Sequence, residues 1–278
     1  MKKILALGTL LLAFNSYSQS YLILNNGVTL TTDKAAFVYD FGNFILPYKV
    51  TLTGGQFFVE EGKLISTDEK GFLYPKNEKV PSKIKGKGNN YLISENGHLY
   101  TFDANGFFYK YDKEAATKKT VGYGGNFFTV KLNDKKPVVS LYTTNTKGNY
   151  FKIDVAGLNP ADITVFGGRF FQTNQGDTYT VTKDGFVYPK PEVKTAAITK
   201  IGGNYFIDTN NSLYTISEEG FLYLPTLPAT LKVPTITKLG TNYFIDQDGQ
   251  LFGVDSNGAV FERAMTAHDL KEAKILSI

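Results

Sequence analysis

The chain has 278 residues, a net charge of +4 at pH 7 and no cysteine. Disulfides, thiolate nucleophiles, thiolate metal sites and a lipid-anchored cysteine are therefore excluded. Aromatic residues make up 14% of the chain, all of them Tyr or Phe, and there are 27 glycines. This composition favours strands and tight turns over helices, and the small net charge indicates no nucleic acid as a partner.

The first 18 residues have the organisation of a secretory signal peptide. A basic "MKK" is followed by the apolar run "ILALGTLLLAF" and the small polar stretch "NSYSQS". Ser16 and Ser18 fit positions −3 and −1 of a cleavage site, so we predict cleavage after Ser18. The protein is then exported, to the periplasm, the surface or the surroundings of a bacterium. The alternative is an uncleaved anchor, although the apolar run is short for a membrane span and no later stretch is apolar enough.

Residues 19–278 repeat one pattern seven times. In residues 197–224 the pattern consists of four short apolar segments, 197–201, 204–208, 212–216 and 221–224, joined by short turns. Such segments are typical of antiparallel strands in hairpins, here called A, B, C and D. The B segments begin with an aromatic residue at spacings of 34 to 43 residues: Tyr21, Phe57, Tyr91, Phe127, Phe170, Tyr205 and Tyr243.

The turns of the units repeat as well. A glycine stands just before segment D in six units, as at Gly220 and Gly258, which indicates a backbone position with positive φ. The first unit has Ala36 there, and we expect this departure to weaken its turn. Prolines fall outside all B and C segments, as a sheet requires, because proline cannot donate to a ladder.

Four antiparallel strands followed by a longer crossover, seven times, predict an all-β seven-bladed β-propeller. The first unit lacks an A segment, whereas Ala273–Ile278 has the A pattern with nothing after it. We therefore expect three N-terminal strands and this one C-terminal strand to complete a blade and close the ring, leaving no open edge.

The phrase "ITKIGGNYFIDTNNSLYTI" at residues 198–216 resembles the core of the RCC1-like repeat, the repeat of the regulator of chromosome condensation. The resemblance covers all seven units and implies the propeller fold. The units are shorter than that family's repeat and lack its Trp-Gly and Gly-Gln-Leu-Gly segments. Its nucleotide-exchange and chromatin roles do not fit an exported protein.

Function is expected on the face that carries the B–C turns and the long D–A crossovers. Lysines are frequent there, so this face is expected to attract an anionic glycan, a cell-wall polymer or a lipid head group. An envelope protein is the alternative partner. The alternative explanation for the lysines is that they are ordinary solvated loop residues, and for the insertion at residues 133–137 that it is neutral and has no function. The candidate ligand-binding residues are Tyr48, Lys118, Lys119, Tyr123, Lys135, Lys136, Lys190 and Lys194.

Two carboxylates carry the enzymatic alternative. Asp208 and Asp246 end the B segments of neighbouring units, and paired carboxylates can cleave a glycoside. An Asp at this place also caps the turn that follows it. No phosphate-binding loop, nucleophile elbow or metalloprotease motif occurs, and the sequence indicates neither a cofactor nor a metal. We predict a non-enzymatic binding or scaffold module, with a glycoside hydrolase or lyase using Asp208 and Asp246 as the alternative.

Overall fold

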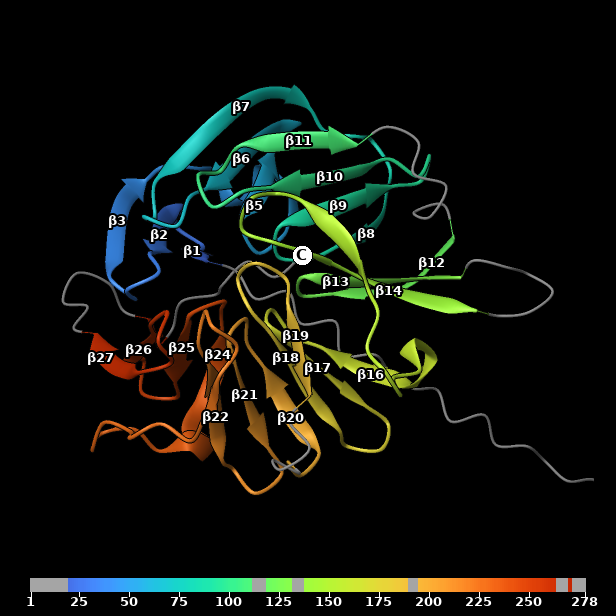
Figure 1. The fold of residues 1–278 in the computed structure, drawn as a ribbon. Coiled ribbons are helices and arrows are strands. Elements are labelled where there is room, and N and C mark those ends of the chain that lie inside the picture. The colour runs from blue at the N-terminus through green and yellow to red at the C-terminus, as the bar shows by residue number, and fades with distance from the viewer. Residues whose placement is uncertain (1–19, 112–118, 132–137, 190–194, 264–269, 272–278) are drawn as a thin grey trace, which may run out of the picture.

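The computed structural model describes residues 20–111, 119–131, 138–189, 195–263 and 270–271. The fold is all-β, with seven antiparallel sheets arranged in a ring (Figure 1). The predicted signal segment 1–18 and the C-terminal strand expected at 273–278 lie outside the described residues. Within the described ranges, no helix is long and apolar enough to cross a membrane.

Each sheet is one blade, and its strands pair in chain order. Blade 1 consists of β1 (Tyr21–Ile23), β2 (Val28–Thr32) and β3 (Val38–Asn43). Blade 2 consists of β4 (Val50–Thr53), β5 (Phe57–Glu60), β6 (Lys63–Thr67) and β7 (Leu73–Lys79). Blade 3 consists of β8 (Ile84–Lys87), β9 (Tyr91–Ser94), β10 (Leu99–Phe102) and β11 (Phe108–Tyr111). Blade 4 consists of β12 (Thr120–Gly124), β13 (Phe127–Lys131), β14 (Val139–Thr144) and β15 (Tyr150–Ile153). Blade 5 consists of β16 (Ile163–Phe166), β17 (Phe170–Thr173), β18 (Thr178–Val181) and β19 (Val187–Pro189). Blade 6 consists of β20 (Ile198–Ile201), β21 (Tyr205–Asp208), β22 (Leu213–Ile216) and β23 (Leu222–Tyr223). Blade 7 consists of β24 (Ile236–Leu239), β25 (Tyr243–Asp246), β26 (Leu251–Val254) and β27 (Val260–Arg263).

Three single-turn 3₁₀ helices precede inner strands. They are η1 (Pro47–Lys49), η3 (Pro160–Asp162) and η4 (Val233–Thr235), each with a proline at its start. Proline suits this position because its fixed φ matches the helix and its missing N–H would be unpaired there anyway. Pro75 and Pro189 lie within the outermost strands β7 and β19, where one edge needs no ladder donor.

The C–D turns are built around one carboxylate in several blades. In blade 2, Asp68 Oδ1 accepts hydrogen bonds from the backbone N–H groups of Lys70 and Phe72, and its Oδ2 accepts one from the Tyr74 hydroxyl at 3.1 Å. Gly71 follows with a φ of 83°. Ala36 takes the same place in blade 1 with a φ of 62°, so this turn keeps its left-handed geometry despite the side chain.

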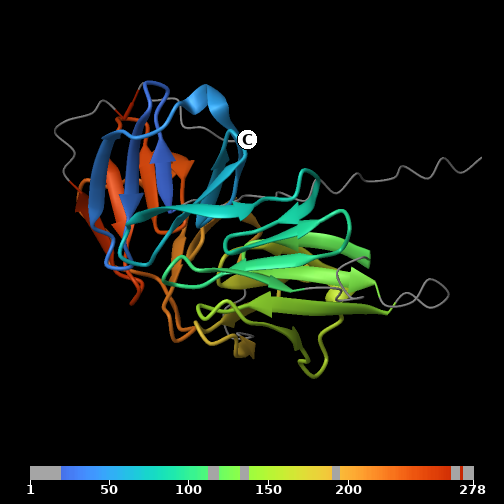
Figure 2. The same cartoon turned by 90° about the horizontal axis from the view of Figure 1, so that it is seen from above.

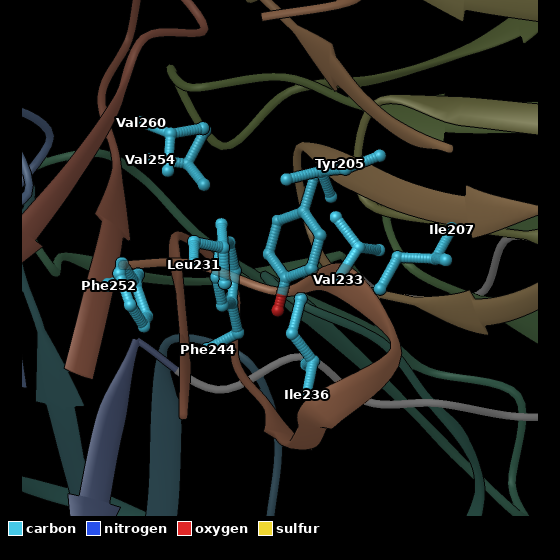
Figure 3. Close-up of a cluster of buried hydrophobic side chains, with 10 residues drawn as sticks. Tyr205, Ile207, Leu231, Val233, Ile236, Phe244, Phe252, Val254 and Val260 are labelled. Carbon is cyan, nitrogen blue, oxygen red and sulfur yellow. The ribbon is translucent and has the colours of Figure 1, made fainter. Parts of the chain in front are cut away.

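The first aromatic residue of each B strand packs between neighbouring blades. Figure 3 shows Tyr205 of blade 6 beside Val233, Ile236 and Phe244, in a cluster where all four are buried. The Tyr205 hydroxyl donates to the backbone oxygen of Tyr243, the equivalent residue of the next blade, at 2.7 Å. These contacts make each blade's core continuous with that of its neighbour.

A closed circle of backbone hydrogen bonds joins all seven C–D turns. The second residue of each turn donates its N–H to the backbone oxygen of the equivalent residue in the next blade, at N–O distances of 2.7 to 3.2 Å. The last turn donates back to the first, through Ser256 N and Lys34 O at 2.8 Å. This turn ring contains Lys34, Glu69, Ala104, Thr146, Lys183, Glu218 and Ser256.

Blades 7 and 1 are joined directly by side chains as well. Figure 2 shows the red strands of blade 7 beside the blue strands of blade 1. The Tyr243 hydroxyl donates to Tyr21 O at 3.0 Å. Arg263 donates to Ala36 O at 2.7 Å and to Ala35 O at 3.0 Å. The circle is therefore closed by contacts among the described residues.

We expect removal of one inter-blade hydroxyl to lower stability measurably. Tyr243→Phe loses the bond to Tyr21 O and should lower the free energy of unfolding at pH 7 by about 1 kcal/mol. The phenylalanine side chain should fit at position 243, because three other blades have Phe at the equivalent position, namely Phe57, Phe127 and Phe170. Urea unfolding measures the change, and the exposed Tyr48→Phe serves as the control. Equal stability of the two variants would contradict this role.

The buried phenols also predict a pH dependence. Burial raises the pKa of Tyr21, Tyr205 and Tyr243. The folded state keeps these protons, whereas the unfolded chain releases them near pH 10. The free energy of unfolding should therefore be fully retained below about pH 10 and fall as the pH rises further. In urea titrations between pH 7 and 11, Tyr243→Phe should show a shallower fall than the wild type.

Candidate functional site

A polar hollow lies on the propeller axis, at the face formed by the A–B and C–D turns. It holds about 1000 Å³, counting its open mouth, and residues of all seven blades line it. The D–A crossovers and B–C turns end at the other face, because successive strands of a blade are antiparallel. This concave site is thus opposite the face that sequence analysis favoured.

Seven polar side chains form the wall of the hollow, one from each blade. Each stands directly before the first aromatic residue of its B strand, and its backbone oxygen accepts a hydrogen bond from the end of strand C in its own blade. We call this set the polar ring: Ser20, Gln56, Asn90, Asn126, Arg169, Asn204 and Asn242. The recurring polar residue before the aromatic was visible in the sequence, but sequence analysis passed over it in favour of the glycines and aromatics around it.

Glycines let the A–B turns approach one another around the axis. A Cβ on Gly125 would lie 1.5 Å from Gly167 O, and a Cβ on Gly168 would lie 2.2 Å from Gly203 O. Neither position can therefore carry a side chain without moving the neighbouring backbone. Because the turns pack backbone against backbone, the polar ring is held on a rigid support.

On one side of the hollow, the polar ring is satisfied by the neighbouring blade. Asn90 Oδ1 accepts from the Thr144 hydroxyl, and Asn90 Nδ2 donates to Asn145 O at 3.0 Å. Asn242 makes the same two bonds, with the Thr32 hydroxyl and Asp33 O. The hydroxyl of a threonine at the end of strand C thus donates a hydrogen bond to the side-chain amide oxygen of the preceding blade.

On the other side, the threonine is replaced by an aliphatic residue in three consecutive blades. Val181, Ile216 and Val254 end strands β18, β22 and β26 and line the hollow. They face the ring residues of blades 4, 5 and 6, which we call the polar arc: Asn126, Arg169 and Asn204.

The polar arc contains buried polar atoms that form no hydrogen bond with any group of the described residues. Asn126 Oδ1, Arg169 Nη1 and Asn204 Oδ1 have no hydrogen-bond partner among the described residues. The orientation of Asn204 is fixed, because its Nδ2 donates to Asp255 O in the next blade at 3.4 Å, just as the amides of Asn90 and Asn242 donate to the equivalent residue of the blade that follows them. Asn204 is only 8% exposed, so its oxygen is largely withdrawn from water.

Charged side chains surround Arg169. Arg169 Nη2 lies 3.6 Å from Glu218 Oε1, and Lys183 Nζ lies 3.8 Å from Glu218 Oε2 and 3.1 Å from Glu219 Oε1. Burial lowers the pKa of Arg169, and the carboxylates of Glu218 and Glu219 oppose this shift. A guanidinium remains protonated in proteins, so the polar arc contains a fixed positive charge.

The residues predicted as ligand contacts lie elsewhere. Lys119 is exposed just before β12, and Tyr48 in η1 is 80% exposed. Tyr123 lies within the inner strand β12 and packs close to Gly86 of the preceding blade. The other five predicted contacts, Lys118, Lys135, Lys136, Lys190 and Lys194, fall outside the described residues. The three described side chains are not part of the hollow's wall.

Asp208 and Asp246 cap the turns that follow them. Asp208 Oδ1 accepts from the backbone N–H groups of Asn210 and Ser212 at 2.9 Å each. Asp246 Oδ1 does the same with residues 248 and 250, also at 2.9 Å. Both carboxylates stand at the end of strand B far from the hollow. In the ranges that the structure covers, no group of His, Asp and Glu is placed to hold a metal ion.

Comparisons with known proteins find solved structures of low similarity. No family model matches the chain, and no curated protein matches it. None of these comparisons shows RCC1-like repeats specifically. A streptogramin B lyase structure is 15% identical with a TM-score of 0.33, covering 90% of this chain and 96% of that one.

Two further solved structures are similar at the same level. Virginiamycin B lyase from Staphylococcus aureus is 12% identical with a TM-score of 0.32, covering 90% of this chain and 89% of that one. PorZ, a bacterial surface component of the type-IX secretion system of Porphyromonas gingivalis, is 14% identical with a TM-score of 0.28, covering 94% of this chain and 41% of that one. At these values the similarities assign neither an activity nor a partner.

The threonine–amide pairing predicts an asymmetry between two matched substitutions. Thr144→Val leaves Asn90 Oδ1 buried without its hydroxyl donor, which should lower the free energy of unfolding by about 1 to 3 kcal/mol. Val254→Thr places a hydroxyl where Asn204 Oδ1 lacks one, and this variant should be at least as stable as the wild type. Urea unfolding measures both, and a larger loss in Val254→Thr than in Thr144→Val would refute the pairing.

Proposed function

We propose that the protein is an exported, non-enzymatic propeller that binds a glycan, or a glycan-bearing component of the cell wall, in its axial hollow. The polar arc is the observation that supports this most directly. A buried polar atom left without a partner costs about 1 to 3 kcal/mol. Three such atoms in adjacent blades, all on the wall of one cavity, are best explained by a ligand that supplies the missing partners.

The composition of the wall favours a hydroxyl-rich ligand. Most of the residues that line it have amide, hydroxyl or charged side chains, and none of its described lining residues is aromatic. Sugar hydroxyls both donate and accept, so they can satisfy amide oxygens and guanidinium N–H groups alike.

The alternatives from the sequence receive less support from the geometry. The carboxylates of Asp208 and Asp246 are engaged by backbone N–H groups, so a glycosidase at that site is not favoured. The lysine-bearing loops of the opposite face, including the exposed Lys119, are kept as a proposed second contact surface for an anionic glycan or an envelope protein.

A binding experiment locates the site. On arrays of glycans and peptidoglycan fragments, the wild type should bind at least one class of glycan. Asn126→Ala with Asn204→Ala should weaken that binding at least tenfold, because both unpaired acceptors of the arc are removed. Asn210→Ala, a matched substitution in an exposed B–C turn, should bind as the wild type does. Loss of binding in Tyr48→Ala with Lys119→Ala, and not in the arc variant, would move the site to the loop face.

Export is tested separately. If residues 1–18 are a cleaved signal, the protein recovered from a bacterial expression host should begin at residue 19 and lie outside the cytoplasm. Intact-mass spectrometry of each cell fraction measures both properties. Recovery only of the full 278-residue chain, from the cytoplasm, would contradict the assignment.

A further inference from the structure

Arg169 makes one side of the hollow different from the rest. It is the only charged residue of the polar ring, and the two ring residues beside it, Asn126 and Asn204, are the ones with an unpaired buried oxygen. The arc therefore presents one cationic donor between two neutral acceptors. A ligand that matches it carries an acceptor group with a donor on either side.

The charge of Arg169 is incompletely compensated within the described chain. Its Nη2 lies 3.6 Å from Glu218 Oε1, beyond the 2.7 to 2.9 Å typical of a charge-assisted hydrogen bond, and its Nη1 has no partner there. Glu218 is also shared with Lys183. A guanidinium offers a planar pair of donors that fits a carboxylate in bidentate geometry, and no bidentate partner is present among the described residues.

We propose that the polar arc recognises a carboxylated sugar, such as a uronic acid in an oligomer, with its carboxylate on Arg169 and hydroxyls of the same or an adjacent sugar ring donating to Asn126 Oδ1 and Asn204 Oδ1. This inference rests on the proposed glycan-binding function. A neutral sugar would leave Arg169 with only the long contact to Glu218 and Nη1 without an anionic partner. In a chain of uronic acids the free hydroxyls of the same ring and of the adjacent rings lie near each carboxylate, and they supply the donors for the two acceptors of the arc.

The acidic groups of the hollow favour a single negative charge over a phosphate dianion. Three cations line the hollow, Lys34, Arg169 and Lys183. Four carboxylates line it as well, namely Asp33, Asp68, Glu69 and Glu218. A dianion would meet stronger repulsion from these carboxylates, and a carboxylate carries only one charge.

The test compares an acid with its own methyl ester. Oligomers of galacturonic and glucuronic acid and their methyl esters share all ring hydroxyls and differ in charge. By isothermal titration calorimetry at low salt, at least one acid oligomer should bind the wild type ten times or more as tightly as its ester. Arg169→Gln should remove this preference while leaving binding of the ester within about threefold.

Glu218→Gln gives a result that structural damage would not produce. It removes the carboxylate that competes for Arg169, while Lys183 keeps its contact with Glu219. Affinity for the acid oligomer should therefore increase several-fold, with binding of the ester unchanged. Thermal unfolding of both variants checks that they fold.

The outcomes separate the two proposals. Equal binding of acid and ester, or an acid preference that persists in Arg169→Gln, overturns the carboxylate assignment and leaves glycan binding intact. Binding of neutral glycans alone has the same meaning. Binding to no glycan overturns both proposals, and preferential binding of a short peptide through its C-terminal carboxylate would replace the sugar with a peptide.

Discussion

The turn ring is the constraint on which the rest of the structure depends. Seven backbone hydrogen bonds run from turn to turn, and the bond from Ser256 to Lys34 joins the last blade to the first. Each turn both donates and accepts, so opening the circle at any blade leaves one donor and one acceptor unpaired. Backbone hydrogen bonds also join A–B turns of neighbouring blades, as from Gln56 N to Asn89 O at 2.7 Å and from Arg169 N to Gly203 O at 2.9 Å. Together these bonds hold one polar residue of each blade at the axial hollow.

The last residue of strand C determines whether the polar ring residue of the preceding blade stabilises the junction between the blades or remains available to a ligand. Where strand C ends in Thr32 or Thr144, the hydroxyl completes the amide of the preceding blade, and the polar group stabilises the junction. Where it ends in Val181 or Val254, the preceding amide keeps an unpaired oxygen toward the hollow. Substitution of one repeated position thus converts an inter-blade bond into a group available to a ligand, without altering the fold.

Rigidity makes such a site suited to binding. The polar ring is attached to turns that pack backbone against backbone, and its side chains project from the start of buried strands. A ligand therefore meets groups that are already oriented and loses less free energy to ordering the protein. The hollow is therefore the stronger candidate, although the loops of the opposite face contain more lysine.

The sequence by itself determined the local features of this protein. Alternation of apolar residues defined the strands, glycines such as Gly220 marked turns with positive φ, and the count of aromatic starts predicted seven blades. These features depend on residues a few positions apart. Only the tertiary structure decided the site. Whether Asn204 Oδ1 has a hydrogen-bond partner depends on Val254 in the next blade, and how far the Arg169 charge is compensated depends on Glu218. Closure of the ring creates these neighbours, and the face on which they meet follows from how whole blades pack, which no local pattern encodes.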